Sequence, residues 1–552
     1  MISSRIKLLS RYYHTLRYLK WIQYTARIRS ILYRPSPPQL ITPPTRQFVT
    51  KNWQSCPQRL ASMQGPNTFQ FLNVTAKLQC ASDWQNCMHS QLWLYNLHYF
   101  DDLCAHDHVA RNVWHRDLIT RWIRENPVAY GVGWAPYPTS LRIVNWVKWA
   151  LAGNTLDSVA QSSLANQTQW LSQTLEFKFL GNHLWVNAKA LIFSGVFFEG
   201  PYATAWLCRG LEIMEKQLGE QILSDGGHFE LSPMYHAIIL EDVLDLVNLS
   251  QFSAQEIPHK FITRLRLVAT QMLDWLRKMT HPDGEISFFN DSAFGIAPKY
   301  MALINYANKL GICGTRDPLL PIEHLESSGY VRLTSKTAML LVDVANVGPD
   351  YLPAHAHADT LSFEFSISNQ RIFVNRGTST YSLGGVRQLE RGTASHNTVE
   401  IDGKDSSEVW GAFRVARRAT PFYVTCDHRG SEVSVEGSHD GYRRLKGKPV
   451  HTRCIQMTDD SISIFDRIEG GDAQLVRSHL LVHPACVVRQ IGESIIIESN
   501  NCIVTLTSTA SHYIQDAGWS MEFGKIIQTS KICFVYGACP THAMIRIVYK
   551  LK

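Results

Sequence analysis

The stretch PAHAHADTLSFEF, residues 353–365, places His355, His357 and Asp359 at every second position, directly before an apolar alternation. In a β-strand these side chains would share one face with Leu361 and Phe363, the side turned toward the core. Each polar group buried there without a partner would cost about 1–3 kcal/mol. We therefore expect the strand to begin near Leu361, or the polar end to face a second polar surface. Neighbouring histidines can also converge on one metal ion, so catalysis, metal binding and an ordinary strand are all open at this point.

Two further polar clusters stand where helices are predicted to begin. Asn182 and His183 precede the helical run LWVNAKAL, where Asn182 could serve only as a helix cap. The segment SDGGHFELSPMYH carries His228, Glu230 and Tyr235 on a loop with Gly and Pro that runs into a helix. Such a loop can display catalytic groups on a rigid scaffold, or it can do no more than turn the chain.

Two more segments add polar residues. HPDGEISFFNDSAFG, residues 281–295, contains Asp283, Asn290 and Asp291, and its composition favours a solvated turn. Residues 391–419 add convergent basic, amide and acidic side chains: Arg391, His396, Asn397, Glu408 and Arg414. This is more polar chemistry than a strand requires.

The elements that must position these residues change type along the chain. From about 90 to 312 the apolar residues recur three and four apart, as in segments 109–126, 139–153, 184–200, 202–223, 234–252 and 262–280. Near 325 short alternating runs rich in Val, Ile, Phe and Thr take over, bounded by turn residues. The pattern predicts an α+β multidomain protein: a helical barrel or array over 48–320, then an antiparallel β-sandwich over 321–552.

An N-terminal arm, residues 1–47, differs from this body. Residues 1–46 contain nine Lys or Arg and no Asp or Glu, whereas the whole chain of 552 residues has a net charge of +7. The basic excess therefore lies in the arm, and nucleic-acid binding by the body has no support. A Pro-rich linker, residues 33–47, ends the arm. Ahead of the linker, the apolar and basic residues of the arm recur at helical spacing. They predict either a helix packed on the body or peripheral contact with an anionic membrane surface.

Several absences bear on the compartment. The arm lacks an apolar run of about 18 residues and a signal-peptide core with a cleavage site. The twelve cysteines are scattered and form no CxxC pair. We expect a cytoplasmic protein, with a periplasmic location or one peripheral to the inner membrane as the alternative.

The motifs, taken in order, resemble the heparinase II/III-type polysaccharide lyases. The resemblance rests on GNHL..NAKAL, DGGHFE.SPMYH, DGEI.FFND, HAHADTLSFE, VNRGT..Y and RGTA.HNTV..DG.DSSE.W..FRV, and it covers roughly residues 85–430. It implies an α/α toroid followed by a β-sandwich, with the active site in the cleft between them. LWLYNLHYFDDL and GWAPYPTSLRIVNWVKWAL further resemble an alginate lyase-like branch found beside capsule and exopolysaccharide synthesis genes.

The resemblance implies β-elimination on a uronic-acid polysaccharide. The enzyme must neutralise the uronate carboxylate, remove the proton on carbon 5 and protonate the leaving oxygen. By motif position, Asn182 and His355 would bind the carboxylate. Tyr235 would be the acid and perhaps also the base, with His183 as the other candidate base. Residues expected to bind or position sugar are Glu230, Arg391 and His228.

The resemblance also implies a structural zinc ion in the sandwich and no organic cofactor. Its ligand positions correspond to His357, Asn375 and His396, but Asn375 replaces the expected aspartate with a neutral amide. Zinc is therefore expected to be weakened or absent unless Asp359 compensates. Two other functions stay open: a glycoside hydrolase, because helical toroids also hold paired carboxylates, and a non-catalytic polysaccharide-binding or assembly factor. The polymer, the endo or exo mode and the oligomeric state are not predicted.

Overall fold

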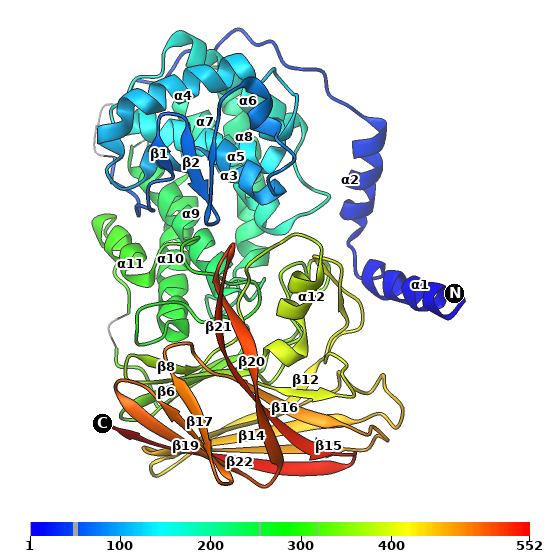
Figure 1. The fold of residues 1–552 in the computed structure, drawn as a ribbon. Coiled ribbons are helices and arrows are strands. Elements are labelled where there is room, and N and C mark those ends of the chain that lie inside the picture. Colours follow the sequence, from blue (N-terminus) through cyan, green and yellow to red (C-terminus); the bar gives the residue numbers. More distant parts are fainter. Residues whose placement is uncertain (1, 48–52, 253–255, 316) are drawn as a thin grey trace.

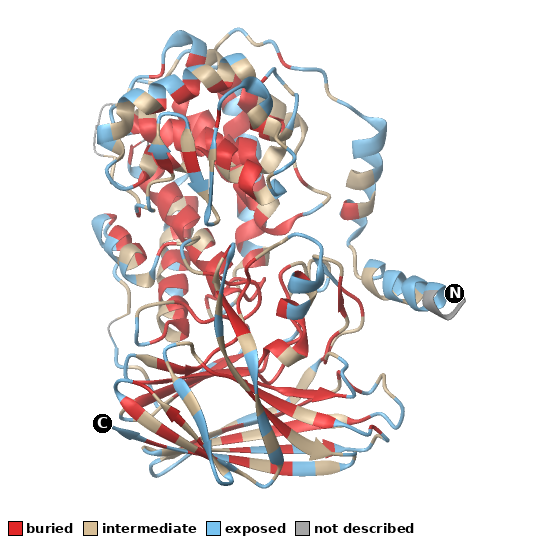
Figure 2. Ribbon diagram, in the orientation of Figure 1, coloured by how far each residue is buried: buried red, intermediate tan, exposed pale blue. Residues whose placement is uncertain are grey.

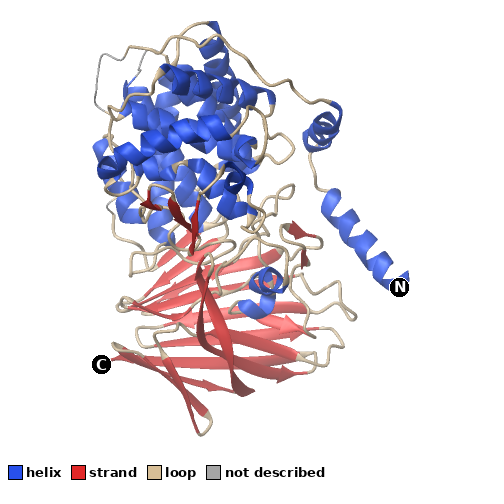
Figure 3. Cartoon of the chain, turned by 45° about the horizontal axis from the view of Figure 1, so that its top comes forward, coloured by secondary structure: helices blue, strands red, loops and turns tan. Residues whose placement is uncertain are grey.

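The computed structural model describes residues 2–47, 53–252, 256–315 and 317–552, and it divides the chain into helices followed by sheets (Figures 1 and 3). The arm forms two helices, α1 (Ile2–Leu16) and α2 (Trp21–Leu32). The body then begins with a small antiparallel sheet of β1 (Met63–Gly65), β2 (Thr68–Phe71) and β3 (Val74–Lys77). The sequence patterns did not predict this sheet, because its strands are three or four residues long.

The helical part is built around two central helices. α7 (Gly181–Phe197) and α9 (Pro233–Phe252) are buried on nearly every face, as expected from their almost continuous apolar sequences. α8 (Pro201–Gln221) packs on α7, and α10 (His259–Met279) packs on α9; each of these buries one apolar stripe. The remaining helices are α3 (Gln91–Tyr99), α4 (Asn112–Glu125), α5 (Pro136–Leu151), α6 (Ser158–Gln173) and α11 (Tyr300–Lys309).

All six helical segments expected from periodicity are helices, with ends shifted by up to three residues. Helices α3, α6 and α11 were not singled out individually, although they fall inside the region expected to be helical. The last of these helices ends at Lys309 and the first strand of the sheet region begins at Ile322.

Three antiparallel sheets make up most of the C-terminal half. One apolar cluster draws side chains from all three, including Phe363, Ile464 and Phe534, so the sheets share a core. The five-stranded sheet contains β4 (Ile322–Leu325), β5 (Tyr330–Thr334), β6 (Ala338–Asp343), β7 (Phe363–Ile367) and β8 (Gln370–Phe373). The four-stranded sheet runs in the order β20 (Ser511–Glu522), β21 (Lys525–Gly537), β16 (Val476–Leu481) and β9 (Val399–Ile401). The eight-stranded sheet runs in the order β12 (Pro421–Arg429), β13 (Glu432–His439), β14 (Val450–Met457), β15 (Ser461–Glu469), β22 (Thr541–Leu551), β19 (Cys502–Ser508), β18 (Ser494–Glu498) and β17 (Val487–Ile491).

The histidine motif lies on a loop between β6 and β7. This loop spans residues 344–362, and the strand begins at Phe363, two residues later than expected. Leu361 has a φ of 63°, in the left-handed region, so the chain turns there before it enters the sheet. His355 and His357 therefore do not share a strand face, and their orientation is set by the loop.

Two short elements lie beside that loop. A short helix, α12 (Gly385–Arg391), and a two-stranded ribbon of β10 (Val409–Trp410) and β11 (Arg414–Val415) follow it in the chain. Figure 1 shows α12 next to the boundary between the helices and the sheets.

The arm lies along one side of the molecule, and its surface is mostly exposed (Figure 2). The linker after α2 has no helix or strand, and it joins the helical part through a β-bridge between Thr45 and Phe198. Among the described residues no helix is long and apolar enough to cross a bilayer. All twelve cysteines are free thiols, and only Cys502 and Cys533 are buried.

Candidate active site

A buried carboxylate, Asp291, organises the boundary between the two halves. Its Oδ2 lies 2.9 Å from His355 Nδ1 and its Oδ1 lies 2.8 Å from His357 Nε2. The Arg387 guanidinium of α12 pairs with both oxygens, with Nη2 donating to Oδ2 at 2.7 Å. Thr378 Oγ1 donates to Oδ1 at 3.2 Å. The expectation of a solvated turn at residues 281–295 is therefore wrong for Asp291, because four partners compensate for its burial.

These partners keep the carboxylate charged. Burial alone would raise the pKa of Asp291, but Arg387, His355 and His357 hold it well below its ordinary value. An ionised carboxylate only accepts hydrogen bonds, so each imidazole must carry a proton on the nitrogen that faces it. Asp291 thus fixes the orientation and the tautomer of both histidines, and it leaves His355 Nε2 pointing away toward the helical part.

Tyr235 lies against His355. Their ring centroids are 4.0 Å apart, and the Tyr235 hydroxyl is 3.0 Å from the hydroxyl of Tyr381. Ser232 positions the tyrosine at the start of α9, because its Oγ accepts from the Tyr235 backbone amide at 3.2 Å and donates to the Asp291 carbonyl at 2.6 Å. Burial, followed by the neighbouring Tyr381, raises the pKa of Tyr235 well above 10. The hydroxyl is therefore protonated at neutral pH and can give a proton away.

Glu230 connects His355 to the start of α7. Its Oε1 accepts from the Asn182 backbone amide at 3.2 Å, and its Oε2 lies 3.4 Å from His355 Nε2. Burial raises the pKa of Glu230, although His355 and Asn182 oppose that shift. Asn182 does not cap α7: the cap position is Leu180, with a φ of 65°, and Asn182 lies in the first helical turn.

His183 is the most open of the expected catalytic side chains. Its side chain is 34% exposed, its Nδ1 lies 3.1 Å from Glu176 Oε1, and its ring is 4.6 Å from that of Tyr137. Burial lowers the pKa of His183, but the Glu176 carboxylate outweighs burial and the net shift is upward. Solvent also reaches this region at Phe179 and Phe413, which are 40% and 41% exposed.

Four of the expected residues thus gather around Glu230: Asn182, His183, Tyr235 and His355. Sequence reasoning assigned no role to several others that the structure places beside them: Tyr137, Tyr381, Arg387 and Phe413. Tyr381 is the last residue of the motif VNRGT..Y, so a signal for it was present. Arg387 lies in a stretch without a recognisable pattern.

Two residues expected to bind sugar have a different position. Arg391 is fully buried, and it donates from Nε and Nη2 to the Ala356 carbonyl at 3.0 and 2.9 Å, so it holds the histidine loop. His228 is also fully buried, with Nε2 3.0 Å from Gln221 Oε1. The expectation that Arg391 and His228 contact the substrate is therefore wrong for this structure. Both side chains are closed off from solvent and paired within the protein, so they support the site from behind.

The expected zinc ligands form a separate buried cluster. His396 Nδ1 lies 3.1 Å from Asn375 Oδ1, and the rings of His396 and His357 are 5.2 Å apart. His357 Nδ1 and His396 Nε2 are buried without a hydrogen-bond partner. Burial keeps both rings neutral: it lowers the pKa of His357 to about 4, despite Asp291, and it holds the pKa of His396 well below its ordinary value.

These residues do not complete a zinc site. Two bare imidazole nitrogens are available, but the Asn375 oxygen is already occupied by His396, and an amide brings no negative charge. Asp359, the possible substitute, instead accepts from the Asn290 backbone amide at 3.4 Å. The described residues contain no group of three or more His, Cys, Asp or Glu placed to hold a metal.

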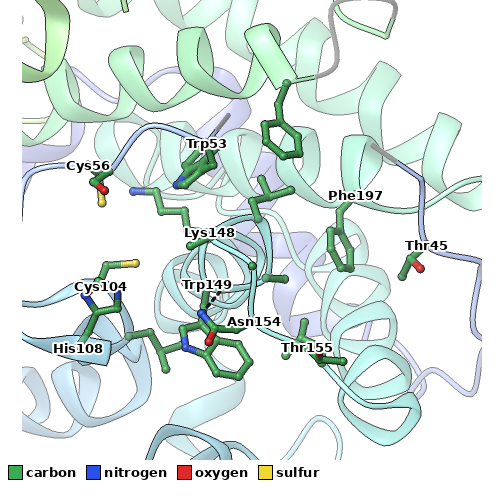
Figure 4. Close-up of a pocket in the computed structure, with 18 of the residues that line it drawn as sticks. Thr45, Trp53, Cys56, Cys104, His108, Lys148, Trp149, Asn154, Thr155 and Phe197 are labelled. Carbon is green, nitrogen blue, oxygen red and sulfur yellow. Dashed lines mark hydrogen bonds between the residues drawn. The ribbon is translucent and has the colours of Figure 1, made fainter. Parts of the chain in front are cut away.

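A cavity of about 920 Å³ lies elsewhere, in the helical part (Figure 4). Its lining includes Cys56, Cys104, Lys148 and Trp149, and none of the expected site residues. Its lining includes Gln47, Trp53 and Phe252, which are next in sequence to residues outside the described part of the chain, so we assign it no function.

Comparison with known families decides the relationship. Residues 150–312 match the family described as "Heparinase II/III N-terminus", and residues 317–545 match "Heparinase II/III-like, C-terminal". The chain belongs to the heparinase II/III-like family. Both halves of the candidate site fall inside the matched regions, with His183 and Tyr235 in the first and His355 and Tyr381 in the second.

Individual relatives are more distant. The chain is 27% identical over 290 residues to a heparin-sulfate lyase of Bacteroides stercoris, covering 47% of this chain and 42% of that protein. A heparin-sulfate lyase of Bacteroides thetaiotaomicron is 25% identical over 289 residues, covering 45% and 41%. The chain thus matches less than half the length of these heparinase II/III-like relatives.

The solved structures agree on the fold. A crystal structure of heparinase III superposes with a TM-score of 0.66 at 18% identity, covering 85% of this chain and 79% of that one. A chondroitin AC lyase of Streptomyces coelicolor superposes with a TM-score of 0.51 at 10% identity, covering 88% and 77%. At these identities the likeness establishes the fold of the heparinase II/III-like chain and nothing of its substrate.

Proposed function

We propose that this chain is a polysaccharide lyase that cleaves a uronic-acid-containing polymer by β-elimination. The observation that carries the proposal is the position of the protonated Tyr235 hydroxyl beside the His355 imidazole. Asp291 fixes the orientation of that imidazole through Nδ1. A proton donor next to an oriented carboxylate-binding group is what this reaction requires. The matched relatives named heparin-sulfate lyase support the same class of reaction.

In the proposed reaction, Asn182 and His355 take up the uronate carboxylate and stabilise the negative charge that develops on it. This role requires His355 to carry a proton on Nε2 as well as on the Nδ1 that donates to Asp291. A base removes the proton on carbon 5, the bond between carbon 4 and its glycosidic oxygen breaks, and a double bond forms between carbons 4 and 5. Tyr235 gives its proton to the leaving oxygen. Since its pKa is raised, the acid role fits Tyr235 as the structure shows it.

His183 is the base that we favour. It lies at the start of α7, is partly open to solvent, and is held through Nδ1 by Glu176. Its Nε2 is then the nitrogen free to accept a proton. The upward pKa shift caused by Glu176 means that the neutral, basic form becomes fully populated only above the ordinary histidine pKa.

The finer architecture and the biological setting belong to the same proposal. Central α7 and α9 with outer α8 and α10 support an α/α toroid, and the core shared by the sheets supports a β-sandwich. The motifs LWLYNLHYFDDL and GWAPYPTSLRIVNWVKWAL support the branch that accompanies capsule and exopolysaccharide synthesis. An acidic surface polysaccharide is the substrate class that we infer.

The test is to incubate the purified protein with a panel of uronic-acid polysaccharides and to follow ultraviolet absorbance and product mass. A lyase yields an unsaturated uronate at the new end without added water. Tyr235→Phe should lower the rate by about 10²–10⁴-fold, because it removes the proton donor. The matched control is Tyr442→Phe, which removes a buried hydroxyl that donates to the Val399 carbonyl at 2.6 Å, away from the site.

Two results would contradict the proposal. Products that carry added water would indicate a glycoside hydrolase. Binding of an acidic polymer without cleavage, unchanged in Tyr235→Phe, would indicate a binding or assembly factor.

A further inference from the structure

The N-terminal arm leaves an unusual amount of apolar surface exposed. A third of the exposed large apolar side chains in the described part of the chain belong to the arm, which is less than a tenth of the sequence. Single exposed apolar residues need no explanation, but a contiguous set of this kind marks an interaction surface. In Figure 2 most of the ribbon of α1 and α2 has the colour of exposed residues.

In α2 the apolar stripe faces away from the protein. Trp21, Ile28 and Leu32 share one side of the helix by their spacing, and they are 78%, 55% and 80% exposed. Gln23 lies on the opposite side, and it is the buried residue of this helix, 1% exposed. A surface helix that only packs on its own protein buries its apolar stripe and exposes its polar side. α2 does the reverse.

In α1 the same reversal occurs. Ile6, Leu9, Tyr13 and Leu16 recur at intervals of three and four residues on one side, and they are 61%, 68%, 64% and 43% exposed. The side of α1 that meets the protein includes Thr15, whose Oγ1 accepts from Trp410 Nε1 at 3.1 Å.

Polar contacts hold the arm in this orientation. Arg417 Nη2 donates to Ser10 Oγ at 2.8 Å, and Gln23 Nε2 donates to the Tyr351 carbonyl at 3.4 Å. Lys20 pairs with Glu220 and lies 3.9 Å from the centre of the Tyr351 ring. The arm is therefore attached to the body through its polar side, and its apolar side remains available for a partner.

The charge of the arm indicates what that partner is. All nine of its ionisable side chains other than tyrosine and histidine are cationic, and seven of them are exposed on or next to the helices: Arg5, Lys7, Arg11, Arg17, Lys20, Arg29 and Arg34. Exposed apolar and basic side chains on short helices match an anionic lipid surface, where the apolar groups enter the interface and the cations meet the head groups.

We propose that α1 and α2 bind the chain to the anionic surface of a lipid bilayer, with both helices lying in the interface. A second copy of the chain fits this surface less well, because it would bring a second set of cations against the first. A soluble acidic polymer would satisfy the cations and leave the apolar side chains in water. The proposal is independent of the lyase activity and concerns where the enzyme works.

The test uses the full-length protein and flotation on vesicles. We expect binding to vesicles of equal parts phosphatidylcholine and phosphatidylglycerol, little binding to phosphatidylcholine alone, and weaker binding as salt is added. Leu9→Ser with Trp21→Ser and Leu32→Ser removes apolar groups that face solvent. Arg5→Gln with Lys7→Gln and Arg29→Gln removes charge. Each triple variant should lower vesicle binding by about tenfold or more.

A matched control keeps the result specific. Val487→Ser with Ile491→Ser changes two exposed apolar residues, 53% and 64% exposed, in a hairpin of the sheet region, and should bind vesicles like the wild type. Unchanged thermal unfolding would show that the arm variants remain folded.

Three outcomes would overturn the proposal. One is failure of the wild type to float with either vesicle, and another is flotation that both arm variants retain. The third is self-association of the wild type in sedimentation velocity that the apolar variant loses, because the arm would then cover a second copy. A soluble anionic polymer, dextran sulfate, adds a further check: the apolar variant should still bind it while losing the vesicles.

Discussion

His355 and His357 are two residues apart and face the same carboxylate, yet they belong to different environments. His355 retains 11% side-chain exposure and stacks on Tyr235, while His357 is sealed beside His396 and Asn375. Each ring donates a hydrogen bond to Asp291, His355 from Nδ1 and His357 from Nε2, so the two neutral rings are opposite tautomers held by the same carboxylate. The difference therefore does not come from the hydrogen bond to Asp291 but from what the second nitrogen meets: Glu230 and the helical part for one, a closed interior for the other. One carboxylate can therefore orient two histidines that have different roles, because only one of the two rings is open to solvent.

Exchanging each histidine for glutamine is the strongest test of whether the two histidines have different roles. His355→Gln should lower the turnover of a uronate polymer by about 10²–10³-fold, because the group that stabilises the developing carboxylate charge is lost. His357→Gln should leave turnover within about tenfold and lower the free energy of unfolding by about 1–3 kcal/mol, because a buried hydrogen bond is lost. Steady-state kinetics and urea denaturation of both variants provide the measurements. Equal losses of activity in the two would contradict the separation of roles.

Removing the shared carboxylate should affect both environments at once. Asp291→Asn leaves the buried Arg387 guanidinium without its anion, so we expect the free energy of unfolding to fall by about 3–5 kcal/mol. Activity should fall as well, because the amide no longer selects the His355 tautomer. Asp283→Asn is the matched control, since Asp283 pairs with Arg371 at a side chain that is 27% exposed. Asp291→Asn with wild-type stability would show that the carboxylate is not the organising group.

Much of the scaffold follows from local sequence pattern, and most of the site geometry does not. The six long helices and the change to strands could be predicted because apolar periodicity reflects burial along each element. α12 was missed because its seven residues, which begin with Gly385, carry too little periodic signal. Asp291 was assigned to a solvated turn because its partners come from elements 64 to 96 residues away in the chain. The pairing of Tyr235 with Tyr381, 146 residues apart, has the same origin.

Loop conformation limited the prediction in a second way. The alternation of His355, His357 and Asp359 suggested one strand face, but the loop that ends at Leu361 sends these side chains to different partners. Asn182, His183, Tyr235 and His355 could be named because complete motifs carried them. Arg391 and His228 were named from the same motifs, yet they are buried, since a motif records a position and not its depth.

A negative charge added to the buried cluster of His357, Asn375 and His396 would test why this cluster does not complete a zinc site. Asn375→Asp places a carboxylate beside two imidazole nitrogens that have no partner, so zinc retention after dialysis should rise from well below one ion per chain toward one. Metal analysis of the folded protein is the measurement, and Asn397→Asp, a buried amide that donates to the Phe363 and Val374 carbonyls, is the control. A full equivalent of zinc in the wild type, lost in His396→Ala, would show that two histidines and an amide suffice.

The smallest expected effect concerns the surroundings of His355, the more exposed of the two histidines, where Glu230 lies beside its ring. Because burial raises the pKa of Glu230, the folded state holds its proton more tightly than the unfolded state. The resulting stabilisation is complete below the ordinary glutamate pKa and is lost as the pH rises through the raised value. Glu230→Gln should therefore flatten the fall in stability that urea denaturation measures as the pH rises above the ordinary glutamate pKa. Glu400→Gln is the control of opposite sign: His479 and Arg477 outweigh burial and lower the pKa of Glu400, so its stabilisation is lost as the pH falls. If Glu230→Gln leaves the dependence of the unfolding free energy on pH unchanged, the group that holds its proton more tightly in the folded state is not Glu230.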